Sequence, residues 1–470
     1  MRSQRRSFLG WDVAPALFVL LPVLAGGGEA AAAEDGVRRD GGVRRVQVTK
    51  GMEITAEGAA VVVAPGECRV GRQLVRVTRA VTLPVAPAPI ITVQDEALKL
   101  SPEAPKWWNQ GTRLRGPFTG ELTAHGSLVP GSLQIRREKG GALLQEGEDY
   151  LLDQGGAHVG LGPKSRVTAD DTVYADYRYS LLRMDTIQVS PKGRVSLKQG
   201  EPHISVPVPP PADPGCATLA HVFVPYHAAR VAPEDIYPIL ETPQQAVTRT
   251  TPGRIPKTMA KLRAGQPVKI VCWGDSVTAG GTASKPELCY VEVFAAGLRE
   301  RFPNAPIEVE NISIGGSASY QWCYPEKSAL PEAWVPICKF QRILDAKPDL
   351  VTIEFVNDAY YNEAQVEQHY SDILQRLAPL GAEVILITPH FVRPDWMGLT
   401  DLRGQECRPY VKGLHAFAQT HRVALADASA RWEHLWKEGL PYMTLLHNTI
   451  NHPDDRGHRL FAEELWKCFE

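Results

Sequence analysis

Ser276, Gly316, Asn357 and His452 are the residues whose types and spacing could do chemistry together. Ser276 stands in "GDSVTAGG" and His452 in "HNTINHPDDRGH", close to the carboxyl end of the chain. A serine hydroxyl whose proton is taken by a histidine becomes a nucleophile toward a carbonyl carbon. N–H groups such as those of Gly316 and Asn357 can stabilise the oxyanion that this attack creates. The chemistry to consider is therefore acyl transfer.

Taken singly, each of these residues has an ordinary structural interpretation. Asp275 and Ser276 could cap a helix, since both residue types are favoured at that position. Gly316 in "NISIGGSAS" could form a plain turn, Asn357 in "EFVNDAY" could be a turn or cap residue, and a lone histidine is usually structural. Only the elements that position these residues can decide between the two interpretations.

The elements that precede these residues are short apolar strands alternating with helices. Five runs are expected to be strands: "PVKIVCW", "IEVENIS", "DLVTIEF", "AEVILIT" and "RVALADA". Helical spacing separates them in "PELCYVEVFAAGLRERF", "PICKFQRILDA", "NEAQVEQHYSDILQRLAPL" and "CRPYVKGLHAFAQTH", and "GHRLFAEELWKCF" closes the chain as a helix. This alternation predicts a parallel sheet covered on both faces, with ligands beyond the carboxyl ends of its strands. Ser276, Gly316 and Asn357 each follow one of these strands, so they are expected to converge.

In this order the blocks resemble those of the SGNH (GDSL-type) hydrolase family, over roughly residues 265 to 470. The resemblance implies a flavodoxin-like three-layer α/β/α fold with a parallel sheet, and an ester-cleaving serine enzyme. It assigns the nucleophile and a backbone N–H donor to Ser276, the second oxyanion donor to Gly316 and the third to Asn357. It assigns the general base to His452 and requires neither a metal nor an organic cofactor.

Two positions depart from the family pattern. Phe355 stands where a glycine is usual, two residues before Asn357, and is expected to narrow or line the site as a substrate contact. Thr449 stands where the acid is usual, three residues before His452. The imidazole could be oriented by the side chain of Thr449 or Asn448, by a main-chain carbonyl of that turn, or by an acid from elsewhere. We hypothesise a Ser-His dyad with a carbonyl partner, because a carbonyl can only accept and so fixes the tautomer; a distant acid is the alternative.

Other polar residues of the same domain have less specific signals. His390 in "TPHF" ends the fourth strand; a structural role is expected, and contact with substrate is the alternative. Asp454 and Asp455 are expected to cap the last helix. His447 and His458 flank the candidate base, but their spacing matches no usual zinc pattern, so no metal site is predicted.

The chain before this domain reads as β-structure. Residues 34–241 contain alternating or β-branched runs such as "LVRVTRAVTLPV", "PIITVQ" and "TVYADYRYS", separated by Gly, Pro and Asp turns. One or two β-sandwiches are expected, and two would be joined near the proline-rich segment 206–215. Residues 242–257 are polar, carry three prolines and are expected to be a linker to the hydrolase domain at 258–470.

Residues 1–33 have the order of an export signal. Arg5 and Arg6 precede "SFLG", an apolar run follows, and Ala31 to Ala33 offer small residues for cleavage. The pattern resembles the twin-arginine type and predicts a periplasmic or extracellular protein. A membrane anchor is the alternative, but the apolar run of about 15 residues is shorter than the roughly 20 that span a bilayer.

Charge and composition exclude some partners. The chain has 51 Lys and Arg against 53 Asp and Glu, so bulk electrostatics do not favour nucleic acid. No stable membrane insertion is expected. With the export signal and the β-rich region, the family resemblance implies an exported serine esterase that removes small acyl groups, chiefly O-acetyl groups, from carbohydrate. A non-catalytic carbohydrate-binding protein on the same fold and an O-acyltransferase using the same serine are the alternatives.

Overall fold

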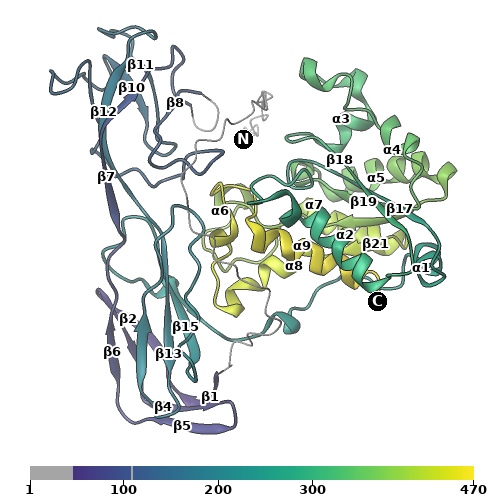
Figure 1. The fold of residues 1–470 in the computed structure, drawn as a ribbon, viewed down its shortest axis with the longest axis horizontal. Helices are drawn as coiled ribbons and strands as arrows, with labels where there is room; N and C mark the ends of the chain where they lie inside the picture. The colour runs from purple at the N-terminus through teal and green to yellow at the C-terminus, as the bar shows by residue number, and fades with distance from the viewer. Residues whose placement is uncertain (1–45, 107–109) are drawn as a thin grey trace, which may run out of the picture.

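The computed structural model describes residues 46–106 and 110–470, which form a β-rich region followed by an α/β region. Figure 1 shows the β-rich region as a tall column beside the α/β region. The expected export signal lies outside the described residues. Within the described ranges, no helix has the length and apolar character needed to cross a bilayer.

The α/β region is built on five parallel strands in the order β18-β17-β19-β20-β21. Counted from the first strand of this sheet, the order is 2-1-3-4-5, that of flavodoxin-like folds. The predicted fold class is confirmed. The strands are β17 (Val268–Gly274), β18 (Ile307–Ser313), β19 (Leu350–Glu354), β20 (Glu383–Ile387) and β21 (Ala424–Ala426).

Helices cover both faces of this sheet because its strands are apolar on both sides. Ile270 and Cys272 of β17 point into one core, while Val271 and Trp273 point into the other. Cys272 is buried, as the sequence predicts, and each of the eight cysteines is a free thiol. The first face carries α1 (Pro256–Arg263), α2 (Tyr290–Arg301), α6 (Pro394–Met397), α8 (Ala428–Glu433) and α9 (Asp455–Lys467). The second carries α3 (Ser319–Cys323), α4 (Gln341–Asp345), α5 (Glu363–Leu377) and α7 (Pro409–Thr420).

Short 3-10 helices fill many of the turns between these elements. In the α/β region they are η3 (Pro286–Leu288), η4 (Pro325–Lys327), η5 (Glu332–Trp334), η6 (Val356–Asp358), η7 (Ala378–Leu380), η8 (Leu435–Glu438) and η9 (Tyr442–Leu445). Upstream lie η1 (Pro233–Asp235) and η2 (Pro243–Gln245). Two of them, η5 and η6, lie beside the candidate site.

The β-rich region consists of small antiparallel sheets around two separate cores, as the β-sandwich prediction requires. We call residues 46–88 and 183–238 the split unit, because the chain leaves this unit and returns to it. Its strands are β1 (Val46–Gly51), β2 (Ile54–Glu57), β3 (Ala60–Val63), β4 (Gly66–Val70), β5 (Gln73–Val77), β6 (Val81–Pro84), β13 (Arg183–Val189), β14 (Val195–Lys198), β15 (Ala217–Val224) and β16 (Ile236–Pro238).

Residues 90–180 form the second core, and we call them the inserted unit. Its strands are β7 (Ile90–Leu98), β8 (Thr112–Arg113), β9 (Gln134–Arg136), β10 (Tyr150–Asp153), β11 (His158–Leu161) and β12 (Val173–Ser180). The expectation of a junction near residues 206–215 is wrong, because this segment lies between β14 and β15 of a single sheet. Figure 1 shows the two units stacked, with β7 and β12 above β13 and β15.

The segment expected to be a linker, residues 242–257, is bonded to the α/β region. Its backbone follows β21: the Thr251 N–H donates to the Leu425 carbonyl at 2.9 Å. The Thr250 hydroxyl donates to the Glu464 carboxylate of α9 at 2.5 Å. These bonds fix the path by which the chain enters the parallel sheet.

Candidate active site

Ser276 lies in the turn that follows β17, with its hydroxyl facing His452. Ser276 Oγ and His452 Nε2 are 2.8 Å apart. Asp275 and Val277 on either side are fully buried, whereas Ser276 is half-buried. The turn therefore presents the hydroxyl at the surface while its neighbours anchor the backbone.

Asp275 ties the loop after β17 to the loop after β19. Its carboxylate accepts the N–H of Val277 at 3.1 Å and the N–H of Asn357 at 3.0 Å. Burial raises the pKa of this carboxyl to about 6, although both N–H donors oppose the shift. The two bonds set the position of Asn357 relative to Ser276.

Gly316 and Asn357 reach the same place from the neighbouring strands. Gly316 has a φ of +83°, a conformation in which a glycine is favoured, and follows β18. A Cβ added at Gly315 would stand 3.6 Å from the Ser276 Cβ, so this loop lies directly against the serine. Asn357 Nδ2 donates one hydrogen to the Ser317 carbonyl at 3.1 Å, which leaves its second hydrogen available.

The backbone N–H groups of Ser276 and Gly316 are also available. Neither donates to a protein acceptor within residues 46–106 and 110–470. With the Asn357 amide, they give three donors beside one hydroxyl, which is the arrangement that an oxyanion requires. The structure brings together the residues that the sequence singled out; their roles remain predictions.

His452 is held in the turn before α9, and its second ring nitrogen faces a carboxylate. Nδ1 lies 2.6 Å from Oε2 of Glu121, a residue 331 positions away in the inserted unit, between β8 and β9. The backbone N–H of His452 donates to Asn448 Oδ1 at 3.0 Å. The hypothesis of a carbonyl partner is therefore wrong, and the alternative of a distant acid describes this structure.

The side chains of Thr449 and Asn448, considered as partners of the imidazole, bond to other groups instead. Thr449 Oγ1 accepts the backbone N–H of His125 at 3.1 Å, and Thr449 has a φ of +62°. Asn448 Nδ2 donates to Glu121 Oε2 at 3.1 Å. Asn448 thus contacts the acid rather than the imidazole, and Thr449 contacts the inserted unit.

The surroundings of Glu121 favour its ionised form. Burial alone would raise its pKa, but hydrogen bonds from His452 and Asn448 and the charges of His452 and Arg113 outweigh burial and hold the pKa below its usual 4.5. A carboxylate can only accept, so Nδ1 carries the proton of a neutral His452. The Nε2 lone pair then faces Ser276 Oγ.

Phe355 does not line the site, contrary to the prediction. Its side chain is fully buried, and its ring centroid lies 5.0 Å from that of Trp273 in the core on the second face. β19 ends at Glu354, and Asn357 already lies in the 3-10 helix η6. The change of backbone direction after the strand lets Asn357 reach the site while Phe355 packs in the core.

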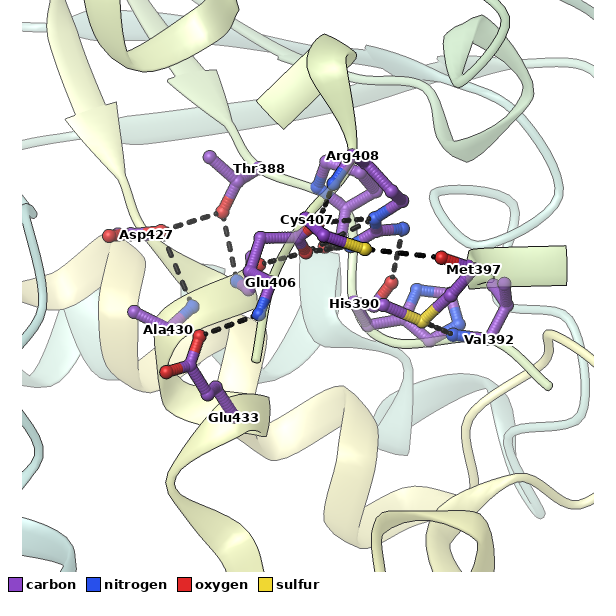
Figure 2. Close-up of polar contacts among 12 residues, drawn as sticks. Thr388, His390, Val392, Met397, Glu406, Cys407, Arg408, Asp427, Ala430 and Glu433 are labelled. Atoms are coloured by element: carbon purple, nitrogen blue, oxygen red, sulfur yellow. Dashed lines mark hydrogen bonds and ion pairs between the residues drawn. The ribbon is translucent and has the colours of Figure 1, made fainter. Parts of the chain in front are cut away.

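His390 is also buried rather than exposed to a substrate. Its Nε2 lies 2.6 Å from the carbonyl oxygen of Asn451, and burial holds its pKa well below the usual value. Its own carbonyl accepts from Arg408 Nη1 at 3.0 Å, within a polar network that also contains Glu406 (Figure 2). The structural role is therefore confirmed and the alternative of substrate contact is wrong, because the His390 side chain is fully buried.

The aspartates after His452 fix the start of α9. Asp454 is its N-cap and accepts the Gly457 N–H at 3.0 Å, as predicted. Asp455 instead accepts from the backbone N–H of Ser284 at 2.8 Å and from its hydroxyl at 2.6 Å. The same short stretch thus anchors both the helix and the loop that follows Ser276.

The histidines flanking His452 also contact backbone groups. His447 Nε2 lies 2.8 Å from the carbonyl of Thr119, and His458 Nε2 lies 3.2 Å from the carbonyl of Gly281. The described part of the chain holds no cluster of three or more His, Cys, Asp or Glu side chains that could bind a metal ion.

Comparison with known proteins covers mainly the α/β region. Residues 272–460 match the GDSL-like Lipase/Acylhydrolase family. No match to a curated protein was found. Among solved structures, the chain is similar to a two-domain esterase active on acetylated mannans, with 21% identity over 47% of this chain and 53% of that one, at a TM-score of 0.36. The chain thus spans about half the length of that esterase.

Two smaller solved proteins are matched over most of their own length. One is a variant of an acetyl xylan esterase from Geobacillus stearothermophilus, with 20% identity over 43% of this chain and 94% of that one, at a TM-score of 0.33. The other is an α/β hydrolase from the metagenome of Lake Arreo, with 20% identity over the same shares of the two chains and a TM-score of 0.32.

Proposed function

Because residues 272–460 belong to the GDSL-like lipase/acylhydrolase family, we propose that this protein is a serine esterase that removes small acyl groups, chiefly O-acetyl groups, from carbohydrate. The single observation that carries the proposal is the 2.8 Å contact between Ser276 Oγ and His452 Nε2. The serine is reachable, and the imidazole nitrogen that faces it is the unprotonated one.

The reaction follows from this contact. His452 Nε2 takes the hydroxyl proton as Ser276 Oγ forms a bond to the ester carbonyl carbon. The tetrahedral intermediate collapses by breaking the bond to the alkoxy oxygen, and His452 returns the proton to the departing alcohol. Water, deprotonated by the same nitrogen, then attacks the acyl-serine, and the acid product leaves with Ser276 restored.

Negative charge develops on the carbonyl oxygen in both steps. The backbone N–H groups of Ser276 and Gly316 and the free Asn357 amide hydrogen are the donors proposed to hold it. Donors fixed in place before the reaction stabilise such a charge without reorganising, and each contributes several kcal/mol to the rate in related chemistry, about 2.7–4 kcal/mol.

A small acyl group is favoured by an indole beside the Gly316 N–H donor. Trp334, at the end of η5, lies so close to Gly316 that a Cβ added there would stand 3.5 Å from its ring. An acyl chain entering beside Gly316 therefore meets a rigid ring. The expected preference is acetate over butyrate over octanoate, and Trp334→Ala should relax it.

We propose further that the alcohol part of the ester is a carbohydrate and that the protein is exported. They rest on the Arg5–Arg6 pattern followed by an apolar run, and on the β-rich region that precedes the hydrolase domain. Release of acetate from acetylated polysaccharides tests the first. The N-terminal sequence of the secreted protein, compared with that of an Arg5→Lys/Arg6→Lys double variant, tests the second.

Hydrolysis of phenyl acetate by the full chain tests the central step. Wild type should exceed Ser276→Ala by at least about 10⁴-fold in kcat, as expected when a serine nucleophile is removed. Ser371→Ala, a serine replacement on α5, serves as the control and should match wild type. Equal rates from wild type and Ser276→Ala would favour a non-catalytic binding protein. Acyl transfer to an added sugar in preference to water would instead identify an acyltransferase.

A further inference from the structure

The turn that carries His452 is bonded to a loop of the inserted unit. We call residues 119–125 the acid loop and residues 447–452 the base turn. Two bonds reach backbone groups of the acid loop: His447 Nε2 donates to the Thr119 carbonyl at 2.8 Å, and the His125 N–H donates to Thr449 Oγ1 at 3.1 Å. Between these two anchors, Glu121 enters the site.

The side chain of Asn448 hydrogen-bonds to both the acid loop and the base turn and joins them in one polar network. Its Oδ1 accepts the backbone N–H groups of Ile450, Asn451 and His452 at 2.9–3.0 Å. Its Nδ2 donates to Glu121 Oε2 at 3.1 Å. The amide that shapes the base turn therefore also fixes the carboxylate, so the two cannot shift independently.

Thr449 stands where the family pattern usually has its acid, and its side chain binds the acid loop. With a φ of +62°, it points its hydroxyl at the backbone of the acid loop rather than at the imidazole. The position without a carboxylate in this chain thus holds in place the loop that supplies one.

We propose that Glu121 is the positioning residue for His452, so that the β-rich region completes the esterase site instead of only accompanying it. This inference rests on the proposed function. The carboxylate holds the Nδ1–H tautomer and stabilises the imidazolium that forms when Ser276 gives up its proton. It stays ionised throughout, and the proton moves only between Ser276, His452 and the departing alcohol.

The low solvent exposure of the Glu121 and His452 side chains supports this role. Glu121 is 17% exposed and His452 9%, so their 2.6 Å contact is shielded from water. Arg113 of β8 adds a positive charge and donates to the Glu121 carbonyl at 2.9 Å, which fixes the backbone of the acid loop. An exposed surface pair would be weakened by solvent, whereas a shielded one keeps its effect on the imidazole.

The test compares Glu121→Gln and Glu121→Ala in the full chain, with Glu148→Gln of the same unit as the control. Both Glu121 variants should keep their thermal unfolding cooperative and their KM near wild type, while kcat falls by about 10²–10⁴-fold. Glu148→Gln, which loses only a pairing with Lys164, should match wild type.

Two rescues distinguish positioning from mere structural support. Formate should raise the rate of Glu121→Ala at least tenfold by occupying the vacated place. The double variant Glu121→Gln/Thr449→Asp should recover at least tenfold over Glu121→Gln, because it returns a carboxylate to the usual position three residues before His452.

The outcomes separate this inference from the proposed function. If Ser276→Ala abolishes hydrolysis while both Glu121 variants stay within threefold of wild type, the function stands and the inference fails. A loss in the Glu121 variants that neither formate nor Thr449→Asp rescues also overturns the inference. If Ser276→Ala is as active as wild type, the proposed function itself is wrong.

Discussion

Among the described residues, two clusters combine a serine, a histidine and a carboxylate: one spans the α/β region and the inserted unit, the other lies within the α/β region, and they differ in the order of their contacts. In the first, His452 stands between Ser276 Oγ at 2.8 Å and Glu121 Oε2 at 2.6 Å. In the second, Ser319 stands in the middle, with its Oγ 2.5 Å from Asp358 Oδ2 and 2.7 Å from His369 Nε2. Only the first order lets a carboxylate hold the tautomer of a base.

The two clusters also differ in how far the serine is exposed to solvent. Ser319 is fully buried at the start of α3, and its hydroxyl donates to Asp358 while accepting from His369. Asp358 also accepts from the Tyr370 hydroxyl at 3.0 Å. This second cluster ties α3, η6 and α5 together. A serine, a histidine and a carboxylate therefore form a catalytic site only when the serine hydroxyl is accessible to a substrate.

Among the variants that distinguish the two clusters, the largest loss of rate is expected at Asn357, the residue next to Asp358. Asn357→Ala should lower kcat by about 10²–10³-fold with little change in KM, because an oxyanion donor is lost. Steady-state hydrolysis of phenyl acetate measures the loss. Asn362→Ala is the matched control: it removes a helix cap on α5, which costs about 1 kcal/mol of stability and should leave the rate unchanged. Equal rates from both variants would contradict the oxyanion role.

Ser319→Ala should have the opposite signature. It leaves the buried Asp358 and His369 without their shared partner, so the free energy of unfolding should fall by about 1–3 kcal/mol. The rate of ester hydrolysis should stay within threefold of wild type. Urea unfolding and the same hydrolysis assay measure the two quantities. A large rate loss without a stability loss would mean that the second cluster also does chemistry.

The two carboxylates should respond to pH in opposite directions. Burial raises the pKa of Asp358 to about 7, so its contribution to stability is present in acid and lost as the pH rises through 7. The pKa of Glu121 is lowered, so its contribution is present above 4.5 and lost as the pH falls through its lowered pKa.

Urea unfolding across pH measures both responses. Relative to Asp358→Asn, wild type should lose about 1–3 kcal/mol of stability between pH 5 and pH 9. Relative to Glu121→Gln, wild type should lose its advantage between pH 5 and pH 3. Parallel curves for either variant and wild type would contradict the corresponding assignment.

The smallest loss of rate is expected at Gly281, where the backbone packs against the His452 imidazole. A Cβ at Gly281 would stand 3.1 Å from His452 Nδ1 and 3.2 Å from its Cε1. Gly281→Ala should therefore displace the ring slightly and lower kcat about five- to tenfold, since small misplacements at a reacting group are costly. An unchanged kcat would show that the ring has more freedom than its contacts indicate.

The parallel sheet and three of its loops could be predicted because their signals are local. An apolar strand followed by a glycine or polar turn marks the place of Ser276, Gly316 and Asn357, and strand order brings those turns to one edge. Phe355 also stands at a strand end, yet the prediction that it lines the site is wrong. A strand end fixes where a residue is, whereas the direction of its side chain depends on packing against helices far away in sequence.

Glu121 carries no sequence signal of its own. It lies in an irregular loop between β8 and β9, 331 residues from His452, and nothing around it distinguishes it from other glutamates. The missing acid at Thr449 was the one clue, and it indicated that a partner was needed but not where to find it. Docking of the inserted unit onto the α/β region is a tertiary property that local patterns do not encode.

The most direct measurement is covalent labelling of the full chain with an alkyl fluorophosphonate, followed by peptide mass mapping. An activated serine hydroxyl attacks the phosphorus and releases fluoride, which leaves one stable adduct. We predict an adduct on Ser276 and none on Ser319, and a strongly slowed reaction in Glu121→Ala. Labelling of Ser319, or no labelling of Ser276 in the folded wild type, would contradict the account.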